Sequence, residues 1–283
     1  MKRLFILIAL TVIAAAANAD FKLWQLAPDN HPVQNMGYVI RTEHGKVIVV
    51  DGGYWRDAGM LMDFINERGG VVTSWFVTHY HDDHCGALVA MLNMPDCPKV
   101  EKVYMRPVSY EKTKMYEDNG FILRFDAAMA EKKIPVVTPV PGTRLVIDGV
   151  TIEILRVYNP EIKVNLGNNS STVYRIGDSS RSVIFLGDLG VEGGKELLAM
   201  YGDKLKSDYC QMTHHGQNGV TKDVYAAIAP KVCLWPTPLW LWENNQGGGY
   251  NTGPWSTFET RRWMDELGVK THYVAKDGIS EIK

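Results

Sequence analysis

The segment from position 79 to position 84 contains three histidines and two aspartates, and both residue types bind zinc and related ions. It directly follows the apolar stretch 71–77, so we expect it to begin where a buried strand ends. Residues two apart on an extended chain point the same way, so His79 and His81 can bind one ion together. Once the chain turns, Asp83 and His84 can reach a second ion. A polar surface loop is the alternative, but three of the chain's eight histidines fall within these six positions, which favours a metal site.

The spacing of this segment resembles the His-x-His-x-Asp-His signature of the metallo-β-lactamase superfamily. Other motifs of that family occur along the chain in the same order. Asp51 resembles the early strand-end aspartate that supports the metal loop from behind without being a ligand, because such partners fix ligand orientation. Asp188 resembles the aspartate that bridges both metals, about 3.5–4 Å apart. Of the pair His214 and His215, we choose His215 as a ligand of the second ion, with His214 as the alternative. Taken alone, each aspartate is equally an ordinary turn residue.

The resemblance spans residues 37–216 and implies an α/β fold, the four-layer αββα sandwich of the superfamily. It also implies two bound metal ions, which we expect to be Zn²⁺, with another divalent transition metal as the alternative. The predicted metal ligands are His79, His81, Asp83, His84, Asp188 and His215.

One motif, in the stretch before Asp188, departs from the pattern of many family members. They carry a histidine before the bridging aspartate as a third ligand of the first ion, whereas residues 167–174 contain none. This pattern resembles the branch that contains the hydrolase domain of DNA-uptake competence proteins and the phosphorylcholine esterases. The first ion would then have His79, His81 and Asp188, with water or a weak oxygen ligand from Asn169 or Ser170. We therefore expect the first site to be the more exposed of the two, unless this stretch is only a turn before a strand.

Two divalent ions that share a water lower its pKa from 15.7 towards about 7 and so supply hydroxide near neutral pH. The expected reaction is hydrolysis of a phosphodiester or related ester, with Asp83 orienting the nucleophile and His214 acting as proton donor or oxyanion partner. Hydrolysis of a β-lactam or lactone is the second hypothesis. A non-catalytic binding module on the same fold is the third. A redox di-iron protein is disfavoured, because that branch typically carries glutamate where this chain has His81.

An aromatic group surrounds the glycine-rich stretch 244–249 after the last ligand. Such rings could stack on a sugar or hold a quaternary ammonium group by cation–π attraction. Tryptophan is more often part of a core, and this alternative stays open. The predicted substrate wall consists of Trp235, Trp240, Trp242, Tyr250 and Trp255.

Charge limits the classes of partner. The formal net charge is −2 and the pI about 6.4, which argues against tight nonspecific binding of nucleic acid. We expect a small-molecule or cell-envelope ester as substrate, and nucleic acid is not favoured.

The first residues are typical of an export signal. Lys2 and Arg3 precede an apolar run from Leu4 to Ala17 that contains one threonine, and a small-x-small cleavage site follows. The run is short for a bilayer span, which disfavours an uncleaved anchor. We predict a signal peptide over residues 1–19, a single hydrolase domain over residues 20–283, and an exported protein, periplasmic or secreted.

Alternating strands and helices position these residues. We expect strands over 21–26, 38–41, 46–50, 71–78, 171–176, 182–186 and 208–212, and a β-hairpin over 144–157 with its turn at Asp148-Gly149. Helices are expected over 57–68, 85–95, 111–131, 193–201, 222–228 and 256–267, and a strand, turn and strand over 274–282. The cysteines, expected to be buried free thiols, are Cys85, Cys97, Cys210 and Cys233.

Overall fold

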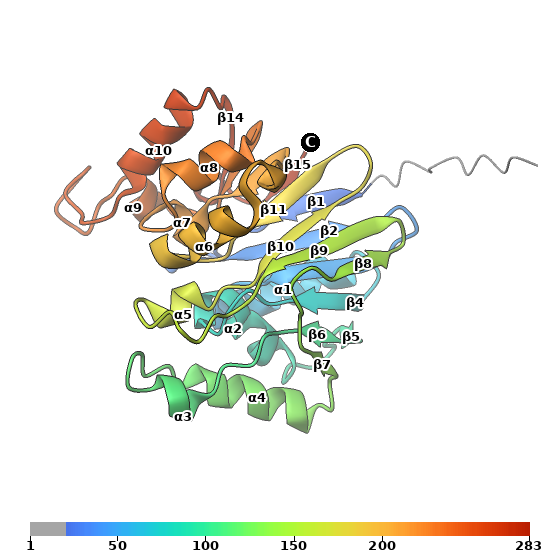
Figure 1. Cartoon of the computed structure of the whole chain (residues 1–283). Coiled ribbons are helices and arrows are strands. Elements are labelled where there is room, and N and C mark those ends of the chain that lie inside the picture. Colours follow the sequence, from blue (N-terminus) through green and yellow to red (C-terminus); the bar gives the residue numbers. More distant parts are fainter. Residues whose placement is uncertain (1–20) are drawn as a thin grey trace, which may run out of the picture.

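The computed structural model describes residues 21–283, and the predicted signal peptide over residues 1–19 lies outside that range. Two β-sheets face each other, and helices cover the outer face of each (Figure 1). The N-terminal part of the chain builds most of one sheet, and the later part builds the other.

The first sheet has eight strands, and its central strands β3 and β4 are parallel neighbours. All five residues of β3 are buried, as expected for a strand covered on both faces. In spatial order the strands are β15 (Ser280–Ile282), β1 (Lys22–Gln25), β2 (Gly37–Arg41), β3 (Val47–Asp51), β4 (Val71–Phe76), β6 (Val103–Tyr104) and β7 (Val136–Val137), with β5 (Lys99–Val100) also paired to β4.

The second sheet has seven strands, of which four are joined in parallel and the rest form antiparallel ribbons. In spatial order they are β14 (Thr271–Val274), β13 (Val232–Trp235), β12 (Tyr209–Gln211), β11 (Ser182–Phe185), β10 (Val173–Gly177), β9 (Val150–Arg156) and β8 (Arg144–Ile147).

Helices in the first half of the chain lie on the first sheet, and most helices in the second half lie against the second sheet (Figure 1). Short helices at the left of Figure 1 lie beside the strand ends. The helices are α1 (Ala58–Asn66), α2 (Asp82–Met91), α3 (Tyr110–Thr113), α4 (Phe121–Glu131), α5 (Leu166–Asn169), α6 (Val191–Tyr201), α7 (Thr213–Gly216), α8 (Lys222–Ile228), α9 (Leu239–Trp242) and α10 (Thr257–Glu266).

Three buried clusters confirm the predicted αββα sandwich. One joins α1, α2 and α4 to the first sheet, and another joins α6, α8 and α10 to the second. The third lies between the two sheets, where Ile48 and Phe76 from one meet Ile154 and Phe185 from the other. These residues alternate along their strands with residues that face the helices, which is the period-two pattern of a β-sheet.

Most predicted elements are present, and two differences are informative. The hairpin over 144–157 forms β8 and β9, with its turn at Asp148-Gly149. The single helix predicted over 111–131 is wrong, because α3 ends at Thr113 and α4 begins only at Phe121. The strand of Val232–Trp235 was not predicted, although it lies inside the second sheet.

All four cysteines are free thiols; Cys85, Cys210 and Cys233 are buried and Cys97 is half-buried. Over residues 21–283, every helix is too short or too polar to cross a lipid bilayer.

Candidate metal centre

The candidate ligands lie where strands of both sheets end at the same edge of the molecule. His79 and His81 follow β4, Asp188 follows β11, and His215 lies in α7 after β12. In Figure 1 this edge is at the left, where α2, α5 and α7 gather. Side chains beyond the carboxyl ends of parallel strands commonly form binding sites in such folds.

The first ligand group consists of His79, His81 and Asp188. His79 Nε2 lies 2.9 Å from His81 Nδ1, so both nitrogens face the same point. Asp188 Oδ2 lies 4.0 Å from His79 Nε2. One ligand atom from each residue lies within 4.8 Å of the others, which is a spacing that a single metal ion can bridge.

The second ligand group consists of Asp83, His84 and His215, whose ligand atoms also lie within 4.8 Å of one another. Asp83 and His84 occupy the first turn of α2, so the chain turns as expected after the extended His79–His81 segment. His215 Nε2 lies 3.0 Å from Asp83 Oδ2 and 3.7 Å from Asp188 Oδ2. Asp188 therefore lies against both groups.

Three buried atoms test whether these residues fit metal ions. Among the described residues, His84 Nε2, His215 Nε2 and Asp188 Oδ1 make no hydrogen bond. His84 Nε2 and Asp188 Oδ1 are 3.1 Å apart, but their angular geometry is not that of a hydrogen bond. Buried polar atoms are nearly always paired, and unpaired ones converging on a single point are expected of metal ligands. The donor set of imidazole nitrogens and carboxylate oxygens is also one that zinc accepts.

Electrostatics favours the protonation state that a metal ligand needs in three of the six side chains. Burial opposes ionisation of Asp83, but the adjacent imidazoles of His215 and His84 outweigh it and lower the pKa of Asp83 to about 2. Burial also opposes ionisation of Asp188, yet the imidazoles of His84 and His215 hold its pKa well below the usual range. Burial and the adjacent imidazoles lower the pKa of His79 well below its usual value. Two carboxylates and a neutral imidazole therefore face the candidate ion positions at neutral pH. In the other two histidines of the 79–84 segment, neighbouring carboxylates outweigh burial and raise the pKa, Glu117 at His81 and Asp188 and Asp51 at His84, so a metal ion must compete with a proton there.

A family comparison covers most of this framework. Residues 32–223 match the model of the metallo-β-lactamase superfamily. The chain belongs to the metallo-β-lactamase superfamily. No curated protein matches the sequence at a significant level.

Solved structures share the superfamily fold at low sequence identity. The metallo-β-lactamase fold protein YhfI from Bacillus subtilis has 13% identity and a TM-score of 0.54 over 93% of this chain and 100% of its own. Unliganded yeast PDE1 has 11% identity and a TM-score of 0.53 over 90% and 97%. Zn²⁺-bound PqqB from Methylobacterium extorquens has 10% identity and a TM-score of 0.50 over 88% of each chain. At such identities the likeness shows the fold.

Asp51 lies behind the 79–84 segment and contacts it, as the superfamily resemblance implied for a supporting aspartate. Its fully buried carboxylate accepts hydrogen bonds from Thr78 N at 2.7 Å and Thr78 Oγ1 at 2.9 Å. Its Oδ2 also lies 2.9 Å from His84 Nδ1, leaving His84 Nε2 to face Asp188. The backbone of Asp51 is in the left-handed region, with φ of 57°. Such strain is typical of functional sites, where the surroundings over-determine the conformation.

Asn169 and Ser170, the weak oxygen ligands expected for the first ion, make hydrogen bonds to the backbone in the structure. Asn169 Oδ1 accepts hydrogen bonds from the backbone of Gly190 and Gly193, so this amide fastens the loop after Asp188. Ser170 Oγ donates to the Gly167 carbonyl at 2.6 Å. Both side chains therefore make hydrogen bonds to the backbone around them, and their role as weak oxygen ligands stays a prediction.

Ser171, the next residue along, contacts the ligands instead. Its hydroxyl lies 3.3 Å from His79 Nδ1 and accepts a hydrogen bond from Asp188 N at 3.0 Å. Ser171 belongs to the segment that the sequence pattern singled out, but it was not among the residues proposed there.

His214 lies beside the centre but outside both ligand groups. Its Nε2 is 3.9 Å from Asp188 Oδ2 and 3.3 Å from Asn168 Nδ2. Its Nδ1 lies 3.2 Å from the Asn218 carbonyl, which can only accept, so Nδ1 carries the proton in the neutral ring. His214 and His215 both have positive φ, 49° and 56°, and this unusual turn brings successive imidazoles to one centre.

The predicted aromatic wall divides into two parts. Trp235 is fully buried, and Trp242 packs edge-on against it at 5.4 Å, so both belong to the core and not to an exposed wall. Trp240 and Trp255 form a second pair at 4.7 Å. Tyr250 is 65% exposed.

The Trp240–Trp255 pair is linked to residues next to the ligands. Ser256 N donates to Asn218 Oδ1 at 3.0 Å, and the Asn218 carbonyl lies against His214. Trp240 Nε1 donates to the Pro32 carbonyl at 2.5 Å. The pair therefore joins the His214 side of the centre to the loop between β1 and β2.

Glu117 is a contact residue that sequence reasoning missed. Its Oε1 lies 2.6 Å from His81 Nε2, and this hydrogen bond lowers the pKa of Glu117 despite partial burial. Glu117 lies between α3 and α4, far from every motif of the sequence, and a helix was expected there. Glu117 is connected to the candidate metal centre only through the fold, which brings it to His81.

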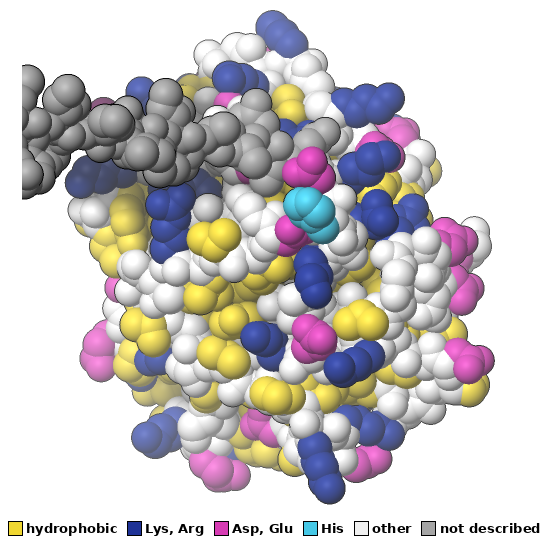
Figure 2. Space-filling view, turned by 90° about the vertical axis from the view of Figure 1, so that its right-hand side faces the viewer, with side chains coloured by type: hydrophobic (Ala, Val, Ile, Leu, Met, Phe, Trp, Pro, Cys, Tyr) yellow, Lys and Arg dark blue, Asp and Glu magenta, His cyan; other side chains and the backbone are white. Residues whose placement is uncertain are grey.

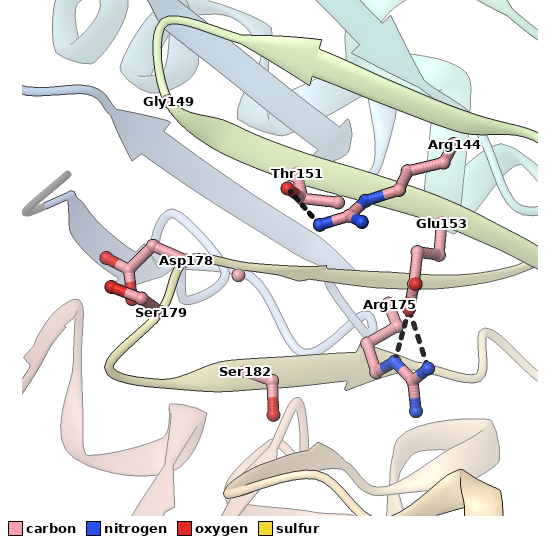
Figure 3. A pocket seen from close by; sticks show the side chains of 9 residues that line it. Arg144, Gly149, Thr151, Glu153, Arg175, Asp178, Ser179 and Ser182 are labelled. Atoms are coloured by element: carbon pink, nitrogen blue, oxygen red, sulfur yellow. Dashed lines mark hydrogen bonds and ion pairs between the residues drawn. The ribbon is translucent and has the colours of Figure 1, made fainter. Parts of the chain in front are cut away.

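A separate hollow of about 390 Å³ lies on the outer face of β8 to β11 (Figure 3). Within it Arg175 Nε donates to Glu153 at 2.6 Å, and Arg144 donates to Thr151 at 3.2 Å. Ser182 borders it at the start of β11, whereas Asp188 lies beyond the other end of that strand. Its lining of paired charges and hydroxyls has no histidine, so we assign the function to the metal centre instead.

Proposed function

We propose that this protein is a dinuclear metal-dependent hydrolase that cleaves a phosphodiester or a related ester. One observation carries the proposal: Asp188 lies between the histidines of the two ligand groups, 4.0 Å from His79 on one side and 3.7 Å from His215 on the other. A carboxylate in that place suits a two-metal site, in which the ions lie about 3.5–4 Å apart. A single-metal protein would need only one of the groups.

The chain's own residues divide the work of such a site. When bound, two divalent ions would lower the pKa of a shared water and polarise the substrate oxygen. Asp83, ionised and fixed by His215, is placed to orient the nucleophile as well as to bind metal. His214 has its Nε2 directed to the Asp188 side of the centre, where it can exchange a proton with the substrate once its contact with Asn168 opens.

Zinc is the metal that we propose, in agreement with the imidazole and carboxylate donor set and with the Zn²⁺ bound by PqqB. Export to the periplasm or the cell exterior is also part of the proposal and is supported by the sequence of residues 1–19.

Substrate charge distinguishes a small ester from nucleic acid. Figure 2 shows the side of the molecule at the right of Figure 1, away from the candidate metal centre, and on this face lysine and arginine side chains are scattered among acidic and uncharged ones. Tight nonspecific binding of a polyanion needs a concentrated basic surface. The formal net charge of −2 therefore favours a small-molecule or cell-envelope ester.

Metal analysis and three substrates test the proposal. We expect about two zinc ions per purified chain, and faster hydrolysis of bis-p-nitrophenyl phosphate or p-nitrophenyl phosphorylcholine than of the β-lactam nitrocefin. Preferential cleavage of nitrocefin would support the alternative β-lactam or lactone hydrolase. Metal-free protein without activity after zinc addition would instead indicate a non-catalytic binding module.

A further inference from the structure

The segment between α3 and α4 reaches back to the metal centre through a single side chain. Glu117 uses both carboxylate oxygens: Oε1 lies 2.6 Å from His81 Nε2, and Oε2 accepts a hydrogen bond from Gly167 N at 2.7 Å. The Glu117 and His81 side chains are 29% and 26% exposed, so this contact closes the solvent side of the first ligand group.

The Glu117 contact determines how His81 can act. An ionised carboxylate only accepts hydrogen bonds, so His81 Nε2 must carry a proton. The lone pair of the neutral ring is then on Nδ1, which lies 2.9 Å from His79 Nε2 and faces the first ion position. A carboxylate bonded to the far nitrogen of a ligating histidine fixes its tautomer and strengthens it as a ligand.

Gly167 makes this arrangement specific to the chain. A side chain at position 167 would collide with Glu117, because a Cβ there would lie 2.3 Å from Oε2. Gly167 begins the stretch in which many superfamily members carry the third histidine of the first ion, and which here contains none. The carboxylate thus links His81 to the segment that has lost a ligand.

We propose that Glu117 is a positioning residue for the first ligand group, acting through His81 and compensating for the missing third histidine. This inference rests on the proposed function, because it requires a metal ion between His79, His81 and Asp188. It predicts that the loss of the Glu117 charge weakens the first ion and leaves the second nearly unchanged.

The competing explanation is that Glu117 only anchors its own segment. Other contacts already do so: Asn119 Nδ2 donates to the Tyr80 carbonyl at 2.9 Å, and Thr113 O accepts hydrogen bonds from the backbone of Tyr116 and Glu117. The segment therefore has anchors that survive substitution of the Glu117 carboxylate.

The test is a double-mutant cycle read by zinc affinity, with chelator competition on the full chain. Glu117→Gln keeps the shape and removes the charge, and we expect it to weaken one of two zinc-binding steps by about 10–100-fold. In a His81→Ala background the same change should have almost no further effect, because coupled residues are non-additive. Glu111→Gln is the control: Glu111 lies in the same region, and its carboxylate pairs with the exposed Lys114.

The outcomes separate this inference from the proposed function. An equal effect of Glu117→Gln with and without His81 would show a merely structural role and overturn the inference. So would two unchanged zinc affinities in Glu117→Gln when the wild type binds two ions normally. Wild-type protein that binds no zinc would overturn the proposed function itself.

Discussion

The two ligand groups of the metal centre differ in what holds them in place. In the second group, His84 is fastened by the fully buried carboxylate of Asp51, and His215 Nδ1 lies 3.0 Å from the Pro236 carbonyl. In the first group, His81 is held from outside by Glu117, on a segment at the surface. The histidines of the second group are thus held by buried residues, whereas His81 of the first group is held by a surface segment.

This difference has a consequence for metal binding. The side chains of His84 and His215 are fully buried, whereas that of His81 is 26% exposed. A more exposed ligand competes with water and loses more conformational freedom when it binds. We therefore expect the first ion to bind more weakly than the second, in agreement with the missing third histidine.

The largest expected effect comes from the residue that both groups share. Asp188→Ala removes a ligand from each group, so we expect hydrolysis to fall by more than about 100-fold, beyond the 10–100-fold typical of residues outside the ligand shell. Steady-state rates and the zinc content of the purified variant would measure this. Asp203→Ala, an exposed aspartate after α6, is the control. Near-normal rates in a folded Asp188→Ala protein would refute its bridging place.

Zinc binding should stabilise the fold, because it supplies partners for His84 Nε2, His215 Nε2 and Asp188 Oδ1. At a free zinc concentration 100 times the dissociation constant, the expected gain in the free energy of unfolding is about 2.7 kcal/mol for one site. Urea denaturation at increasing zinc should show two steps, the tighter from the second group. Magnesium, which prefers oxygen ligands, should stabilise far less at equal concentration. Equal stabilisation by both metals would contradict the assigned ligands.

The residues that the structure brings together as candidate ligands could be predicted from the sequence, but most of the residues that support them could not. The signature at positions 79–84 is local, so its spacing alone predicts which of its side chains lie together. Glu117 comes to His81 only because the segment after α3 folds back over the centre, and no pattern of nearby residues records that. Likewise, the buried Arg156 donates to the carbonyls of Asn169 and Ser171 and so positions the segment before β10.

The fold shows the same limit. The Asp148-Gly149 turn between two apolar runs predicted the β8–β9 hairpin, and these two residues have the positive φ values that they tolerate. The prediction of one helix over 111–131 merged α3 with α4, because the mixed polarity of this stretch marks no boundary at 114–120. Strands of two residues, such as β5 and β6, are too short to show any period.

Asp51→Asn tests whether the second group depends on the core. Its carboxylate fixes His84 directly, so we expect the tighter zinc-binding step to weaken by about 10–100-fold. Disturbed buried hydrogen bonds to Thr78 should also cost about 1–3 kcal/mol of stability. Zinc titration measures the change in affinity, and urea denaturation measures the change in the free energy of unfolding. Asp148→Asn, which loses hydrogen bonds to Thr42 and His44 elsewhere, is the control. If Asp51→Asn weakened only the weaker zinc-binding step, Asp51 would support the first group and not the second, contrary to our assignment.

The smallest expected effect concerns the aromatic pair beside His214. Trp240 and Trp255 are partly exposed, and if they face a quaternary ammonium group their attraction is worth about 0.5–1 kcal/mol. Trp240→Ala should therefore raise KM for p-nitrophenyl phosphorylcholine by about two- to fivefold and leave kcat unchanged, because the ring touches no reacting atom. The KM for bis-p-nitrophenyl phosphate, which has no cation, should stay the same. Met200→Ala, on the exposed side of α6, controls for surface effects. Equal shifts for both substrates would show that the pair shapes the entrance to the centre without recognising a positive charge.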